Sequence, residues 1–292
     1  MAWRSTWNEP PRHPRWGFLA DRGGFFPPGV KLVLLVTVAV FFLEILYMQP
    51  LLEWGAVTVR GILHFQVWRL VTYMFLHGPK IDHILINMFI FVMLGVAFER
   101  QIGTRQFLAM YLVAGIVGGL FEVAFNGLMY WKYGSASLGV AGRTFLDVPA
   151  VGASAGVAGV LVAFAVLNPR AIFLLMFIIP IQARWIALIY VLVETRHVFM
   201  GLLHGWTGNV ANAAHLGGMA LGFVWMKWGP WLAGALRRGV RRRRPRVPER
   251  PETEQKAELD RILDKIRQAG LDSLSIREKM FLQETSKKHR DG

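Results

Sequence analysis

The chain contains no cysteine, and this absence excludes disulfide bonds, thiol chemistry and zinc sites built from cysteine ligands. Acidic residues are also scarce, with 19 aspartates and glutamates against 33 lysines and arginines, so the formal net charge is +14. A basic excess can indicate nucleic acid binding. Here, however, the basic residues cluster in particular connecting segments and in the C-terminal part, which fits membrane topology better. We therefore expect a lipid bilayer as partner and no nucleic acid.

Charge of either sign is nearly missing from several long stretches, and 54% of the 292 residues are hydrophobic. A bilayer core of about 30 Å needs about 20 mostly apolar residues, and runs of that length recur along the chain. The pattern predicts an all-α polytopic membrane protein, a six-transmembrane-helix bundle. The expected spans cover about residues 30–48, 83–98, 107–125, 152–168, 185–203 and 212–228. Residues 171–181 are apolar but too short to span, which favours a hairpin or re-entrant piece on the cytosolic side.

The composition divides the chain into four parts. These are a polar leader at 1–29, a membrane domain at 30–230, a basic and proline-containing linker at 231–251, and a helical cytosolic tail at 252–292. The leader lacks the early apolar core of a signal peptide, so we expect it to be retained in the cytosol. The basic run at 237–246 favours contact with anionic lipid.

The tail has the pattern of two short amphipathic helices. Ile262 lies on the apolar face of the first helix, Gly270 can end that helix, and Ser275 with Glu278 fits a capping box that opens the second. A hairpin of this size is marginal alone. It could dock on a partner that the sequence does not identify, on the membrane domain, or on itself.

Lysines and arginines are more frequent in the segments that lie inside when the N-terminus is cytosolic. Six spans then place both termini in the cytosol, which predicts an integral protein of the plasma (inner) membrane. In this orientation Ser154 and His215 each lie a few residues into their spans from the outer surface, so the two side chains share a depth.

Small residues surround both of these polar side chains. Gly152 and Gly156 flank Ser154, while Gly218 and Gly222 follow His215. Small residues four positions apart let membrane helices approach closely, so a short serine side chain can reach an imidazole on a neighbouring helix. That juxtaposition predicts a nucleophile and its base. The backbone N–H groups at the helix start near Ser154 would also help to hold a developing oxyanion.

A second polar pair, His83 and Asn87, lies four residues apart and therefore on one face of the second span. Both side chains can donate hydrogen bonds, and paired donors aimed at one point can complete an oxyanion hole. Polar residues in lipid are costly unless they face the bundle or water, so a functional role is expected for them. Three intramembrane acids, Glu44, Glu122 and Glu194, are expected to reach headgroups or to bond neighbouring helices.

These motifs together resemble those of the rhomboid family of intramembrane serine proteases, over roughly residues 30–230. Gly152-Ala153-Ser154-Ala155 matches the family's GxSx motif. Its HxxxN pair is matched by His83 and Asn87, its late histidine and glycine ladder by His215, Gly218 and Gly222, and its WR pair in the first outer loop by Trp68 and Arg69. Two positions depart from the family pattern. Ala155 stands where glycine is common, and Ala158 replaces an aromatic residue that packs on the histidine.

The resemblance implies a serine endopeptidase with a Ser154–His215 dyad that cleaves transmembrane segments of membrane proteins near the outer leaflet. It implies His83, Asn87 and the Ser154 N–H as the oxyanion hole, structural support from Trp68 and Arg69, and neither metal nor organic cofactor. No carboxylate lies in the outer halves of the fourth and sixth spans, in agreement with a dyad. The alternative is a catalytically silent relative that binds membrane clients. A transporter is a third alternative, which the sequence favours less because no inverted repeat is evident. The sequence has neither HExxH nor GxGD, which excludes zinc and aspartyl intramembrane proteases of the usual kinds.

Overall fold

The computed structural model describes residues 24–134, 144–175, 178–205, 211–239 and 252–290. The leader up to residue 23 and residues 240–251 of the expected linker lie outside the described residues, whereas residues 231–239, also expected in the linker, are helical. The chain separates into two compact units, residues 1–233 and 234–292. The first of these, residues 1–233, is the membrane unit.

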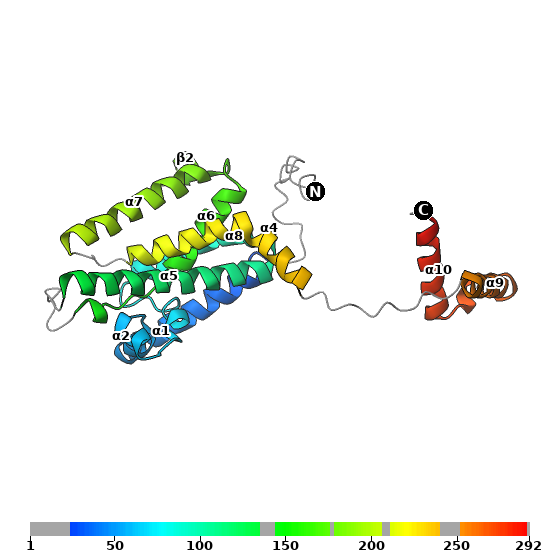
Figure 1. Cartoon of the computed structure of the whole chain (residues 1–292), viewed down its shortest axis with the longest axis horizontal. Coiled ribbons are helices and arrows are strands. Elements are labelled where there is room, and N and C mark those ends of the chain that lie inside the picture. Colours follow the sequence, from blue (N-terminus) through cyan, green and yellow to red (C-terminus); the bar gives the residue numbers. More distant parts are fainter. Residues whose placement is uncertain (1–23, 135–143, 176–177, 206–210, 240–251, 291–292) are drawn as a thin grey trace. The chain divides into compact units, whose positions relative to one another are not determined.

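Six long helices form the membrane unit (Figure 1). They are α1 (Pro28–Gly55), α4 (Ile81–Ile102), α5 (Thr104–Tyr133), α6 (Ser154–Leu167), α7 (Ala183–His204) and α8 (Asn212–Gly239). Shorter helical turns are α2 (Val59–Leu63), α3 (Arg69–Thr72) and η1 (Phe145–Asp147). Each of the six expected spans overlaps one of the six long helices. Among the described helices, α1, α4, α5 and α7 are long and apolar enough to cross a membrane, and α6 is apolar but shorter.

The first helix is longer than the sequence suggested. It continues through Pro50 to Gly55, beyond the expected span of about residues 30–48. Proline lacks the N–H that the helix needs and clashes with the preceding turn. The helix absorbs this by a kink at Tyr47, whose φ and ψ of −133° and 44° are not helical.

The short apolar segment after α6 forms an antiparallel hairpin of β1 (Ile172–Leu175) and β2 (Ile179–Gln182). Ile172 pairs with Gln182 and Phe173 with Ile181. The prediction of a hairpin here is therefore confirmed. Its strands are too few to change the fold class.

Helix α6 is the innermost element of the membrane unit. Eleven of its residues, Ala155 through Ala165, are buried. It packs against α4, α5 and α7. A helix that is apolar on all faces is expected to be buried on all sides. Ser154 is the first residue of this buried helix.

Two buried glutamates hold the starts of other helices through backbone N–H groups. Glu99 accepts from Gly29 and Val30 at 2.8 and 2.7 Å, at the start of α1. Glu122 on α5 accepts from Ala214 at 3.1 Å, in the first turn of α8. Hydrogen bonds to a charged group contribute about 1.5–3 kcal/mol each, so these carboxylates hold helix starts in place.

Glu44 on α1 plays the same part for a loop rather than a helix. Its carboxylate accepts from the N–H groups of His77 and Gly78 at 2.9 and 3.0 Å. Glu122 therefore bonds a neighbouring helix, as expected, whereas Glu44 bonds a loop; both side chains are buried.

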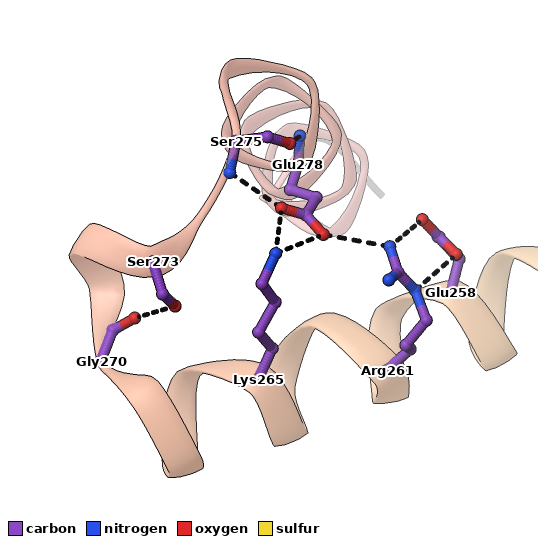
Figure 2. Close-up of polar contacts among 7 residues, drawn as sticks. All are labelled: Glu258, Arg261, Lys265, Gly270, Ser273, Ser275 and Glu278. Atoms are coloured by element: carbon purple, nitrogen blue, oxygen red, sulfur yellow. Dashed lines mark hydrogen bonds and ion pairs between the residues drawn. The ribbon is translucent and has the colours of Figure 1, made fainter.

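The second unit is a helical hairpin of α9 (Glu252–Ala269), η2 (Leu271–Ser273) and α10 (Ile276–Arg290). Gly270, with φ of 78°, ends α9 as expected, and Ile262 is fully buried. Figure 2 shows the polar contacts that join the two helices. The Glu278 carboxylate accepts from the Ser275 N–H at 2.8 Å while Ser275 Oγ accepts from the Glu278 N–H at 3.3 Å, so the predicted capping box is confirmed.

The same carboxylate of Glu278 receives hydrogen bonds from α9. Lys265 Nζ lies 2.9 Å and Arg261 Nη2 3.1 Å from its oxygens (Figure 2). The Ser275 backbone N–H, then Lys265, lower the pKa of Glu278 to about 2. The hairpin is therefore closed by a charge cluster as well as by its small apolar core.

Candidate active site

The side chains of Ser154 and His215 meet between the starts of α6 and α8. Ser154 is the first residue of α6, and His215 lies in the first turn of α8. The Oγ of Ser154 is 2.7 Å from Nε2 of His215, and the histidine is 6% exposed. A hydroxyl and an imidazole nitrogen at this distance form the hydrogen bond that an activated serine requires.

Glycines on α8 allow this contact by bringing two backbones together. A Cβ added to Gly218 would lie 2.0 Å from the Ala155 carbonyl oxygen, and one added to Gly222 would lie 2.2 Å from that of Gly159. No side chain fits there, so α6 and α8 touch backbone to backbone. The two glycines that the sequence singled out on α8, Gly218 and Gly222, both lie at this contact.

The small residues at the start of α6 face two different neighbouring helices. Ala155 and Gly159 make the contact, whereas a Cβ on Gly156 would meet the ring of Tyr111 on α5 at 2.6 Å. Gly152 lies before the helix rather than in it. Ala155, which departs from the family's glycine, is thus tolerated, because its carbonyl oxygen rather than its Cβ faces Gly218.

Gly152 turns the chain into α6. Its φ is 126°, which favours glycine, and its N–H donates to the Tyr73 carbonyl at 2.8 Å. Two residues earlier, Ala150 pairs with Val57 through hydrogen bonds of 2.9 and 3.1 Å. The segment that leads to Ser154 is therefore held from both sides by the loops that follow α1 and α3.

His83 lies beside Ser154, as the oxyanion hypothesis requires. A Cβ added to Gly152 would lie 3.1 Å from Nε2 of His83 and 3.5 Å from Oγ of Ser154, so the two side chains flank one point. The other ring nitrogen, Nδ1, is 2.9 Å from the carbonyl oxygen of His77. That carbonyl belongs to the loop that Glu44 holds.

Asn87 is buried one turn further along α4, but its amide is engaged. Nδ2 donates to the carbonyl oxygen of His83 at 2.9 Å, within its own helix. The structure thus places Asn87 on the same helix face as His83 without aiming its amide at Ser154.

The Nδ1 atom of His215 has partners that sequence reasoning missed. Glu194 Oε1 lies 3.0 Å away and Tyr190 Oη 3.2 Å away. Both come from α7, four residues apart and so on one face of that helix. The tyrosine ring centroid is 5.9 Å from that of the imidazole, so an aromatic residue does pack on the histidine although Ala158 is small. The i, i+4 spacing of Tyr190 and Glu194 was the available signal.

Trp68 and Arg69 support the loops around the site. Arg69 is buried, and its guanidinium donates to the carbonyl oxygens of Ala56 and Glu53 at 2.6 and 2.5 Å. Trp68 Nε1 donates to the Trp54 carbonyl at 3.2 Å, and the two indoles stack. Neither side chain forms a hydrogen bond to Ser154 or His215 in the part of the chain described.

The fold and this contact define the class, a polytopic helical membrane protein with a buried serine–histidine pair. Residues 64–229 match the Rhomboid domain and residues 250–288 match a family of unknown function (DUF6576). Because the first match covers more than half of the chain, the chain belongs to the rhomboid family.

Named relatives agree with the family. The rhomboid protease AarA of Providencia stuartii is 27% identical over 209 residues, which are 65% of this chain and 68% of that protein. The rhomboid protease GlpG of Klebsiella pneumoniae is 30% identical over 128 residues, 43% of this chain and 46% of that protein. The GlpG of Salmonella typhi is 28% identical over the same share. The chain thus spans about half the length of the GlpG proteins that it matches.

Three predictions from the sequence are confirmed by these matches and by the fold. The chain is a member of the rhomboid family, an all-α polytopic integral membrane protein, and a serine protease of the rhomboid type. Among the described residues, no group of three or more His, Asp or Glu is placed to hold a metal ion.

Proposed function

We propose that the chain is an intramembrane serine endopeptidase in which Ser154 is the nucleophile and His215 is the base. The 2.7 Å contact between Oγ and Nε2 carries the proposal, since the base must reach the proton that it removes. Its substrates are transmembrane segments of membrane proteins, cut near the outer leaflet. Lysine and arginine counts favour cytosolic termini in the plasma membrane, with the site toward the outside.

The chemistry proceeds in two stages on these side chains. Ser154 Oγ attacks the peptide carbonyl carbon while Nε2 of His215 takes the hydroxyl proton. The C–N bond then breaks, and the imidazolium gives that proton to the leaving amine. Water attacks the acyl-serine ester in the second stage, its proton passes through His215 to Ser154, and a carboxylic acid leaves.

The proposed oxyanion donors differ in whether their N–H groups are free to donate a hydrogen bond. The Ser154 N–H is the most available donor, because first-turn N–H groups have no partner within their helix and carry the positive end of its dipole. His83 donates from Nδ1 to His77, so its Nε2 donates to an oxyanion only when the ring is protonated. Asn87 donates only after its amide turns away from the His83 carbonyl.

The test compares wild type, Ser154→Ala and His215→Ala, each as the full chain in liposomes with a generic transmembrane substrate. We expect both variants to lose cleavage and labelling by a fluorophosphonate. Ser273→Ala is the matched control, because that hydroxyl bonds Gly270 in the second unit. Cleavage that survives in Ser154→Ala would exclude the dyad. A wild type that binds substrate without cleaving it would favour the silent, client-binding alternative.

A further inference from the structure

The hydrogen bonds of Glu194 differ from those of the other buried glutamates described in the membrane unit. Glu44, Glu99 and Glu122 each accept from backbone N–H groups and so hold the fold. Glu194 Oε1 instead faces Nδ1 of His215 at 3.0 Å. The side chains of Glu194 and His215 are only 6% and 8% exposed. A buried acid whose bond goes to the ring of the base is placed for chemistry rather than for capping.

We propose that Glu194 is a positioning residue that fixes the tautomer and orientation of His215, which makes the site a Ser–His–Glu arrangement contributed by three helices. The inference rests on the proposed function of Ser154 and His215. An ionised carboxylate only accepts hydrogen bonds, so it selects the imidazole with its proton on Nδ1. That tautomer leaves a lone pair on Nε2, the atom that faces the serine hydroxyl.

The carboxylate also stabilises the charge that forms during the reaction. When His215 takes the serine proton, an imidazolium arises in a site with little access to water. A carboxylate 3.0 Å from that ring lowers the cost of the cation, because charges interact strongly where water is excluded. Glu194 itself keeps no proton in the cycle.

Other groups near His215 do not replace this role. Tyr190 Oη lies 3.2 Å from Nδ1, but a neutral phenol supplies no charge. The oxygens of Glu122 bond Ala214 and Asn126 rather than the ring of His215. Ser154 occupies the opposite ring nitrogen. Glu194 Oε2 has no hydrogen-bond partner among the described residues. The contact between Glu194 and His215 is therefore made by Oε1 alone.

The test uses full-length protein in liposomes, with Glu194→Gln compared with wild type. We expect kcat and the rate of fluorophosphonate labelling to fall together by about 10²–10⁴, while KM stays within about threefold. We also expect the acidic limb of the kcat/KM profile to move to lower pH, because the imidazolium loses its counter-ion. Glu194→Asp keeps the charge and should be at least about tenfold faster than Glu194→Gln.

Glu99→Gln is the matched control, a buried glutamate changed in the same way far from His215 in the chain. It should lower thermal stability and leave kcat and the pH profile of the folded protein unchanged. Glu194→Gln within about threefold of wild type, or Glu194→Asp no better than Glu194→Gln, would overturn the inference. These outcomes leave the dyad intact, whereas activity in Ser154→Ala would remove the dyad itself.

Discussion

At the scale of single residues, Asn87 can act as an oxyanion donor only if its amide changes partner, because the amide is close to the site but bonded elsewhere. The bond to the His83 carbonyl must be exchanged for a bond to the oxyanion if Asn87 acts as a donor. That exchange requires only a side-chain rotation, since the helix position is already correct.

We predict that Asn87→Ala lowers kcat by about 10²–10³, the loss typical of one oxyanion donor. Single-turnover cleavage rates, with substrate affinity measured separately, check this. Gln101→Ala is the control, since Gln101 lies on the same helix and its amide likewise donates to a carbonyl one turn back, that of Ala97. Unchanged kcat in Asn87→Ala would reassign the side chain to packing.

The residues of the site were readable from the sequence to different degrees. Ser154 and His215 stood out because polar side chains are rare within apolar spans and because glycines marked the helix faces around them. Glu194 was recognised only as an intramembrane acid and Tyr190 not at all, because the sequence of α7 does not show which of its faces meets α8. The sequence also does not show which of Gly156 and Gly159 meets α8, since both lie on a helix that is buried all round.

At the scale of elements, the crossing of α6 and α8 governs the site. The two helices touch through Gly218 and Gly222, so the Ser154–His215 distance depends on a contact that admits no side chain. The positions of the long helices were predictable from hydropathy. The continuation of α1 through Pro50 was not, because a kink lets a helix tolerate proline.

We predict that Gly218→Ala strongly reduces cleavage and lowers stability by about 1–3 kcal/mol, because the new Cβ forces the two backbones apart. Thermal melting and turnover in the same detergent check this. Gly127→Ala in α5 is the matched control, since a Cβ there meets nothing within 4 Å. Equal behaviour of the two variants would show that α6 and α8 do not need the close contact.

At the scale of the whole molecule, the orientation in the membrane decides which compartment the site faces. All the proposed site residues lie in the unit formed by residues 1–233. Lys80 precedes α4, and Arg105 lies near the start of α5, so the helix between them should separate the two positions by the thickness of the bilayer.

The absence of cysteine makes the orientation directly measurable. We predict that an impermeant maleimide added outside intact cells labels Lys80→Cys and not Arg105→Cys, and that inside-out vesicles reverse the result. Both positions are exposed in the folded chain. Labelling of Arg105→Cys from outside would place the N-terminus and the basic segments on the wrong side and would contradict cytosolic termini.

Helix α7 is the least buried of the four long apolar helices, yet it carries both Tyr190 and Glu194. Its exposed face would contact the lipid acyl chains. A change in the tilt of α7 would therefore move Tyr190 and Glu194, the two partners of His215, together with the helix. Bilayer thickness would then change the turnover rate, and the same protein would cleave at different rates in thin and thick membranes without any change at Ser154.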